Sequence, residues 1–291
     1  MGSVIPLKKS ANSAYLELKN MLGVKLQKVE SLIEQKLKSD VDLIKKMSEH
    51  HLKSGGKRLR ALLTLESAKL TGYKEEVRDI NLAACVELIH SATLLHDDVI
   101  DESQRRRGNL SANEVWGNKT SVLVGDFLFS RAFQLMAKYG DIGTLKILSD
   151  TSVVIAEGEV LELSNDRDPT INEDLYFKVI NAKTASLFSA ACQVGGISAK
   201  ATNKEIESLK SFGTNFGMAF QLIDDAIDYA SDKNSLGKNI GDDFKEGKIT
   251  LPIILAYGRS NKKEKGFLKK MFKQSDGDEN NFILVRELLF K

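Results

Sequence analysis

Aspartates at helical spacing are the residues of this chain that are best placed to do chemistry. Asp97, Asp98 and Asp101 stand at positions i, i+1 and i+4 in the segment LLHDDVID. On a helix, Asp97 and Asp101 lie one turn apart on the same face, with Asp98 beside them. Carboxylates so close together repel one another and raise one another's pKa. Mg²⁺ relieves that repulsion, because it binds one or two carboxylates together with substrate phosphates.

The same pattern occurs a second time, in the segment QLIDDAIDYASD. Asp224, Asp225 and Asp228 repeat the spacing, again after an apolar run. A solvated acidic helix face explains a single motif of this kind. Two copies in matching contexts favour a metal site between facing helices, which is where helical bundles build such sites.

Cationic residues near these aspartates are suited to binding a polyanion. The segment KSGGKRLR (53–60) has two glycines followed by Lys57, Arg58 and Arg60, where a helix is expected to begin. Glycine lets backbone N–H groups approach a phosphate, and a helix N-terminus favours anions. The spacing does not match a Walker loop. Further candidates are Arg105, Arg106, Arg107, Lys183, Thr184, Lys238, Lys248 and His90. Taken singly, each of these is also expected as an ordinary surface charge or, for His90, as a core histidine.

Helices are the elements expected to position these residues. The 291-residue chain has only 3 prolines, and 3.6-residue periodicity dominates while strand alternation is scarce. Residues 81–101 and 212–232 are small or apolar around most of a helix circumference, which predicts helices inside a bundle. We therefore predict an all-α fold of about ten or more helices, forming a single domain over residues 1–291.

Composition restricts the class of protein. Hydrophobic residues make up 42% of the chain, and the net charge of +2 gives no global field that would recruit nucleic acid. No segment approaches the ~18 apolar residues of a membrane span. Cys85 and Cys192 lie in apolar helical settings, which favours reduced thiols in the cytosol. We predict a cytoplasmic protein with no nucleic-acid partner and no integral membrane segment, which touches a membrane to release a greasy product.

As a set, these motifs resemble those of the trans-isoprenyl diphosphate synthases, also called polyprenyl synthetases. The resemblance runs from about Lys53 to Pro252. It rests on GGKRLR, LLHDDVIDES…RRG, VGDFLFSRAF, Lys183-Thr184, FQLIDDAIDY and GKNIGDDFKEGKITLP. It implies an isoprenoid-synthase helical bundle with a central cavity. It also implies a homodimeric prenyltransferase that joins isopentenyl diphosphate to an allylic diphosphate, with about three Mg²⁺ ions per active site.

The resemblance also implies a role for individual residues. The principal metal ligands would be Asp97, Asp101 and Asp224, with Asp98 and Asp228 near them. The residues that grip the allylic diphosphate would be Arg106, Lys183, Thr184, Gln221 and Lys238. The pocket for isopentenyl diphosphate would comprise Lys57, Arg60, His90 and Arg107. Supporting candidates are Arg58, Asp225 and Lys248.

Product length is expected to depend on side chains beneath the first motif. The growing tail should descend beside the helix that carries Asp97, past Thr93, Ala92 and Ile89. None of these is aromatic, so nothing blocks the first one or two turns, at ~5.4 Å per turn. Candidates for a deeper floor are Phe129, Phe133 and Met136. We predict a product of geranylgeranyl length or longer, such as a quinone side-chain precursor.

Other classes of protein remain as alternatives. A terpene cyclase shares the fold and the first motif, but it needs no isopentenyl pocket and its second motif usually carries Asn, Ser and Glu. A non-catalytic subunit is expected to lose one aspartate motif, and a plain helical scaffold needs neither. A shorter product, geranylgeranyl or farnesyl diphosphate, is a further alternative.

The chain departs from the family pattern in two ways. Ala61 stands where family members usually have proline. The chain also ends earlier than typical relatives, so we expect C-terminal helices to be missing.

Overall fold

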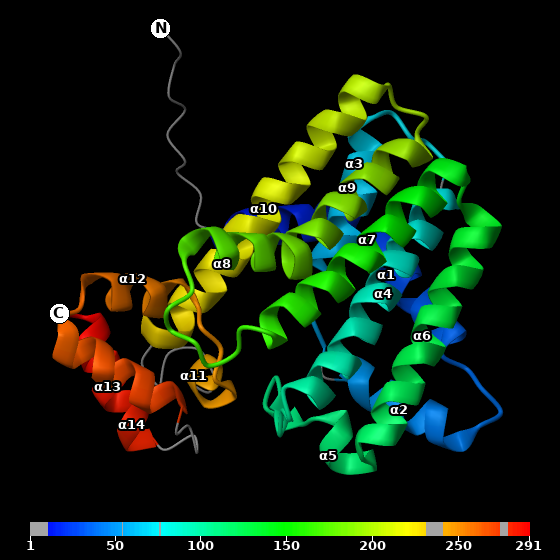
Figure 1. The fold of residues 1–291 in the computed structure, drawn as a ribbon. Coiled ribbons are helices and arrows are strands. Elements are labelled where there is room, and N and C mark those ends of the chain that lie inside the picture. Colours follow the sequence, from blue (N-terminus) through cyan, green and yellow to red (C-terminus); the bar gives the residue numbers. More distant parts are fainter. Residues whose placement is uncertain (1–10, 54, 76, 231–240, 274–278) are drawn as a thin grey trace, which may run out of the picture.

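The computed structural model describes residues 11–291 apart from residues 54, 76, 231–240 and 274–278, and it confirms the all-α fold (Figure 1). The helices are α1 (Ala11–Lys36), α2 (Asp42–Lys53), α3 (Leu59–Leu70), α4 (Arg78–Ile100), α5 (Ala112–Trp116), α6 (Asn118–Tyr139), α7 (Ile142–Leu163), α8 (Glu173–Ile180), the π-helical turn η1 (Asn181–Ala185), α9 (Ser186–Ser198), α10 (Asn203–Ala230), α11 (Asp242–Glu246), α12 (Leu251–Arg259), α13 (Lys262–Lys273) and α14 (Glu279–Leu289). Among the described residues, the only strands are β1 (Arg105–Arg106) and β2 (Asn109–Leu110), which pair antiparallel.

Helix α4, which carries the first aspartate motif, lies at the centre of the bundle. It packs against α1, α3, α6 and α9, and Leu82, Val86, Ile89 and Ala92 are fully buried within it. This burial confirms the prediction for residues 81–101, because a helix that is apolar all round has no face suited to water. Burying so many apolar side chains fixes α4 as a rigid support for its last turn, where the aspartates stand.

Helix α10, which carries the second motif, is less buried than its sequence predicts. One face packs on α9 and η1, whereas Phe212 and Ile223 on other faces are more than half exposed. The prediction that residues 212–232 lie inside the bundle is therefore wrong for this part of the circumference. Small residues around a helix allow close packing, but they do not determine how many sides receive a neighbour.

The C-terminal helices form a second apolar cluster against the end of α10. Figure 1 shows α11 to α14, in orange to red, gathered on one side of the bundle. Tyr229 of α10, Phe244 of α11, Phe272 of α13 and Phe282 of α14 are buried together, and the Phe244 and Phe272 rings meet edge to face at 5.2 Å. This cluster fixes α11 and the loop after it next to the second aspartate motif.

Polar side chains at helix N-termini determine where several helices begin. Asp141 accepts a hydrogen bond from the Thr144 backbone N–H at 2.8 Å at the start of α7. Thr202 and Glu205 form a reciprocal capping box before α10, with the Thr202 N–H donating to the Glu205 carboxylate at 2.7 Å. No helix within the described ranges has the length and apolar character needed to cross a bilayer.

Candidate active site

The first aspartate motif lies at the C-terminal end of α4, and two of its carboxylates form ion pairs with basic side chains. Asp98 is only 1% exposed. The Arg106 Nε donates to both of its oxygens, at 2.8 Å and 3.0 Å. Asp101 forms an ion pair with Lys248, whose Nζ lies 2.7 Å from the carboxylate. These charge-assisted contacts hold the last turn of α4 to β1 and to the loop after α11.

Asp97 differs from these two residues, because among the described residues no cation lies within ion-pair distance of its carboxylate. Burial, and next the charge of Glu159, raise the pKa of Asp97 to about 7. Asp97 is a half-buried carboxyl group that resists ionisation because it lies next to other acids. An added cation would stabilise its ionised form. Within the described residues, no three acidic, histidine or cysteine side chains form a ready-made metal cage. Carboxylate oxygens whose ionisation is disfavoured suit a hard cation such as Mg²⁺, which takes its remaining ligands from phosphate and water.

The second aspartate motif, on the last turns of α10, is held by neutral hydrogen-bond donors. The Tyr176 hydroxyl donates to one oxygen of Asp225 at 2.5 Å, and the Gln221 amide donates to the other at 2.6 Å. Asp228 accepts hydrogen bonds from two backbone N–H groups at the start of α11, each at 3.3 Å. Burial, and next the charge of a carboxylate on α11, raise the pKa of Asp228 to about 6. Asp224 is half-buried beside them.

Contacts join the two motifs at one end of the bundle. Lys248, paired with Asp101 of the first motif, donates its backbone N–H to the Asp243 carbonyl at 2.8 Å. The Asp243 N–H in turn donates to Asp228 of the second motif. The region is called the acidic mouth from here on, and it comprises Asp97, Asp98, Asp101, Asp224, Asp225, Asp228, Lys183 and Lys248. The structure thus brings together two motifs that lie more than a hundred residues apart in the sequence.

The predicted pair Lys183-Thr184 lies on η1 and reaches both sides of the mouth. The Thr184 hydroxyl donates to the Gln221 side-chain oxygen at 2.8 Å, which links η1 to α10. The Lys183 Nζ lies 2.8 Å from Glu159 and also donates to Glu162, both on α7. A π-helical turn is rare and often marks a functional site, because it shifts side chains out of the α-helical register.

A second set of predicted residues gathers around Arg107, which directly follows β1. Arg107 covers the GGKRLR segment so closely that a Cβ on Gly56 would lie 2.7 Å from the Arg107 Nη1. Glycine at this position therefore permits the contact. The Arg60 guanidinium stacks on the Phe188 ring at 4.1 Å. His90, on α4, lies within the field of both arginines. The structure thus brings together three of the residues predicted to bind isopentenyl diphosphate, and we call Arg60, Arg107, His90 and His51 the basic pocket.

The two histidines of the basic pocket are held neutral. Burial, and next the charges of Arg106 and Arg107, lower the pKa of His51 to about 3. Burial, and next the charge of Arg60, also lower the pKa of His90 well below its ordinary value. Such an excess of positive charge is expected of a site that receives an anion.

The remaining predicted cations have different surroundings. Arg58 donates to Glu87 at 3.4 Å and adopts a left-handed backbone conformation before α3. Lys57 is exposed, and its carbonyl accepts a hydrogen bond from Tyr15 at 3.3 Å. Lys238 lies outside the described residues.

The side chains predicted to control product length are placed unevenly. Ala92 and Ile89 are fully buried beneath the mouth, and the Thr93 hydroxyl donates to the His90 carbonyl at 2.8 Å. Phe133, expected at the floor of a shaft, is instead 49% exposed on α6. This exposure is that of a single chain, and it does not test whether the ring closes a shaft. The roles of all four residues stay predictions.

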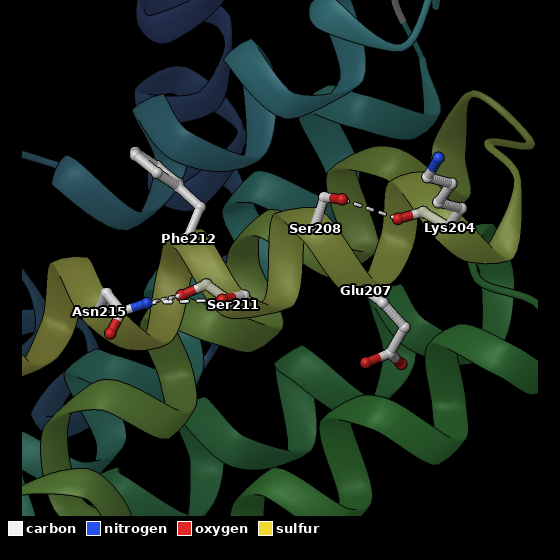
Figure 2. A pocket seen from close by; sticks show the side chains of 6 residues that line it. All are labelled: Lys204, Glu207, Ser208, Ser211, Phe212 and Asn215. Carbon is white, nitrogen blue, oxygen red and sulfur yellow. Dashed lines mark hydrogen bonds between the residues drawn. The ribbon is translucent and has the colours of Figure 1, made fainter. Parts of the chain in front are cut away.

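A shallow hollow on the outer face of α10 is separate from these sites. Figure 2 shows its lining, which consists of Lys204, Glu207, Ser208, Ser211, Phe212 and Asn215. Its polar groups bond within the helix, as when the Ser208 hydroxyl donates to the Lys204 carbonyl at 2.9 Å. The hollow lies nine residues before Asp224, or about 13 Å along the helix, and it is a surface feature of α10. The central cavity predicted between the aspartate helices stays a prediction.

Reasoning from the sequence missed three residues of these sites. Glu159 and Glu162 stand three positions apart near the C-terminal end of α7, and this acidic pair was the available signal. His51 belongs to a pair of histidines that is separated from the GGKRLR segment by three residues. Each reaches its site through contacts with another helix, so spacing along the chain did not single them out.

Comparisons with known proteins identify the family. Residues 41–288 match the family model described as polyprenyl synthetase. The octaprenyl diphosphate synthase of Escherichia coli (strain K12) is 45% identical over 249 residues, which cover 86% of this chain and 77% of that protein. The all-trans-nonaprenyl-diphosphate synthase (geranyl-diphosphate specific) of Rhodobacter capsulatus is 42% identical, covering 83% of this chain and 74% of that protein.

A solved structure agrees with these sequence relatives. The polyprenyl synthase of Caulobacter crescentus CB15, complexed with calcium and isoprenyl diphosphate, superposes with a TM-score of 0.91 and 45% identity, covering 95% of this chain and 84% of that one. The chain therefore belongs to the polyprenyl synthetase family. It is a prenyltransferase with the all-α isoprenoid-synthase fold. That residues 1–291 form a single domain stays a prediction.

Proposed function

We propose that this prenyltransferase condenses isopentenyl diphosphate head-to-tail with an allylic diphosphate, in the presence of Mg²⁺, to make a long-chain trans-polyprenyl diphosphate. The observation that carries the proposal is the convergence of both aspartate motifs with Lys183 and Lys248 at one end of the bundle. The basic pocket lies beside it, and its two histidines lie within the field of Arg106 and Arg107. Two neighbouring sites of different charge suit two diphosphates that react differently.

The acidic mouth is the proposed site of the allylic diphosphate. The allylic C–O bond breaks as negative charge grows on the leaving diphosphate, and fixed positive charge stabilises that change. Lys183 and Lys248 supply ammonium donors there, while Thr184 and Gln221 supply neutral ones. Mg²⁺ on Asp97, Asp101 and Asp224, about three ions by analogy with the family, would supply further positive charge to the leaving group when bound.

The basic pocket is the proposed site of isopentenyl diphosphate. Arg60 and Arg107 offer forked donors that match diphosphate oxygens, and the neutral His90 adds a directional donor. Holding the double bond close to the allylic carbon makes its attack effectively intramolecular. A carbon–carbon bond then forms, and the proton that is lost passes to the departing diphosphate.

Buried apolar side chains beneath the mouth protect the reactive cation from water. Ala92 and Ile89 have no exposed surface, so the first turns below Asp97 are dry. Ala92 places no bulky ring on the proposed tail path, and the octaprenyl and nonaprenyl relatives support a long-chain product. Replacing Ala92→Phe should shorten the product, as measured by chromatography of the extended lipids. A product of unchanged length would contradict this tail path.

We also propose that the protein is a homodimer in the cytoplasm. Large apolar side chains are exposed on α6 and α7, among them Leu123, Phe133, Val153 and Val160. Such a face on adjacent helices is suited to pairing with a second copy. Cys85 and Cys192 are both buried free thiols, which fits a reducing compartment.

One incubation tests the proposed function. The protein is mixed with Mg²⁺, farnesyl diphosphate and labelled isopentenyl diphosphate, and its lipids are separated by length. Elongated diphosphates are expected. A cyclic hydrocarbon formed without uptake of label would indicate a terpene cyclase, and absence of any product would contradict catalysis by this chain.

A further inference from the structure

Two glutamates of α7 surround the ammonium group of Lys183. Its Nζ lies 2.8 Å from a Glu159 oxygen and donates to Glu162 as well. Lys183 and Glu159 are each 17% exposed and Glu162 is 31% exposed, so solvent screens these contacts only in part. Neither glutamate belongs to an aspartate motif.

Backbone packing between α7 and η1 makes this arrangement possible. Gly158 is buried, and a Cβ there would lie 2.7 Å from the Ala182 Cβ and 3.1 Å from the Lys183 backbone nitrogen. The two helices therefore touch at Gly158. Glu159 follows directly, and Glu162 stands one turn further on the same face. The π-helical turn directs Lys183 towards that face.

The number of donors on Lys183 suggests what the glutamates do. An ammonium group has three N–H donors. Glu159 and Glu162 engage two of them, which fixes the direction of the third. We propose that Glu159 and Glu162 are positioning residues that hold Lys183 so that its third N–H meets the allylic diphosphate. This inference rests on the proposed function, because that function assigns the diphosphate to the acidic mouth.

The charges of the mouth agree with this role. Burial lowers the pKa of Lys183, but the charges of Glu162 and Glu159 outweigh it and raise the pKa, so the lysine stays an ammonium ion. The charges of Asp101 and Glu246, and after them that of Glu162, raise the pKa of Lys248, whose positive charge lies close to Lys183. Without these glutamates, no carboxylate of α7 would offset the repulsion of Lys183 by Lys248, and Lys183 would be free to adopt other rotamers.

The experiment measures binding of an unreactive thio analogue of farnesyl diphosphate by calorimetry in saturating Mg²⁺. Glu159→Ala and Glu162→Ala should each weaken binding by about tenfold, since each removes an acceptor that orients a charged donor. The double variant should approach Lys183→Ala. The corresponding Gln variants should recover most of the affinity, because an amide oxygen still accepts a hydrogen bond. Glu157→Ala, at an exposed position of the same helix, is the control and should leave binding unchanged.

Four results would overturn the proposal. Unchanged binding in the alanine variants would mean that Lys183 needs no support. Tighter binding would mean that the glutamates compete with the diphosphate for Lys183. If the alanine variants bound isopentenyl diphosphate more weakly by the same factor, Glu159 and Glu162 would only stabilise the fold. A lowered melting temperature that the Gln variants share would mean the same. If the wild-type protein elongates substrates and the variants bind the analogue normally, this inference is contradicted and the proposed function is not. A wild-type protein that binds the analogue but makes no product would instead contradict the proposed function.

Discussion

Lys183 and Lys248 in the acidic mouth are each held by two carboxylates, whereas Arg60 and Arg107 in the basic pocket lie close to imidazoles that stay neutral. Negative charge thus exceeds positive charge in the mouth, and the reverse holds in the pocket. An anionic substrate is attracted to the pocket directly. In the mouth, the same substrate needs metal cations to offset the aspartates. This comparison predicts that binding of only one of the two substrates, the one held in the acidic mouth, depends on metal ions.

The largest expected effect comes from an aspartate of the mouth. Asp97→Asn keeps the shape of the side chain but removes a charge that would hold Mg²⁺, so the turnover number should fall by about 10³-fold. Steady-state elongation with labelled isopentenyl diphosphate measures it. Asp150→Asn, exposed on α7 and paired only with Lys146 in the contacts described, is the matched control. Activity of Asp97→Asn within a few-fold of wild type would show that the mouth does not depend on this carboxylate.

A smaller and more selective effect is expected in the pocket. Arg60→Gln removes a buried guanidinium, which should raise the KM for isopentenyl diphosphate by about 30-fold and leave the KM for the allylic substrate nearly unchanged. Both constants come from the same assay with each substrate varied in turn. Arg259→Gln, at an exposed position, serves as the control. Equal changes in both constants would mean that the mouth and the pocket are not separate sites.

The smallest effect concerns pH and the neutral His51. Its pKa is lowered to about 3 in the folded protein, against an ordinary value of about 6.5 when unfolded. As pH falls, His51 therefore takes up a proton in the unfolded chain before it does so in the folded protein. The free energy of unfolding consequently decreases below pH 6.5, and the decrease levels off near pH 3. Between pH 7.5 and pH 5 the wild type should lose about 2 kcal/mol relative to His51→Gln. Urea unfolding at both pH values measures the difference, and parallel losses in the two proteins would contradict a neutral, buried imidazole.

Much of the site was predictable because its residues lie within short segments. The spacing of Asp97 and Asp101 alone predicts that they share a helix face. The glycines before Lys57 predict that a helix starts there. Partners across helices were not predictable, since nothing in the sequence places Glu162 of α7 beside Lys183. The π-helical turn that brings them together also has no clear sequence pattern. Phe133 shows the converse limit, because an aromatic residue on an amphipathic helix can face outwards as readily as inwards.

Calorimetric titration of each substrate with and without Mg²⁺ tests the two-site account most directly. The unreactive allylic thio analogue should bind at least about tenfold more tightly when Mg²⁺ is present, because the acidic mouth repels it otherwise. The affinity for isopentenyl diphosphate should change by less than about threefold, because the basic pocket supplies its own cations. Equal gains for both ligands, or no gain for the allylic analogue, would contradict the division of charge between the mouth and the pocket.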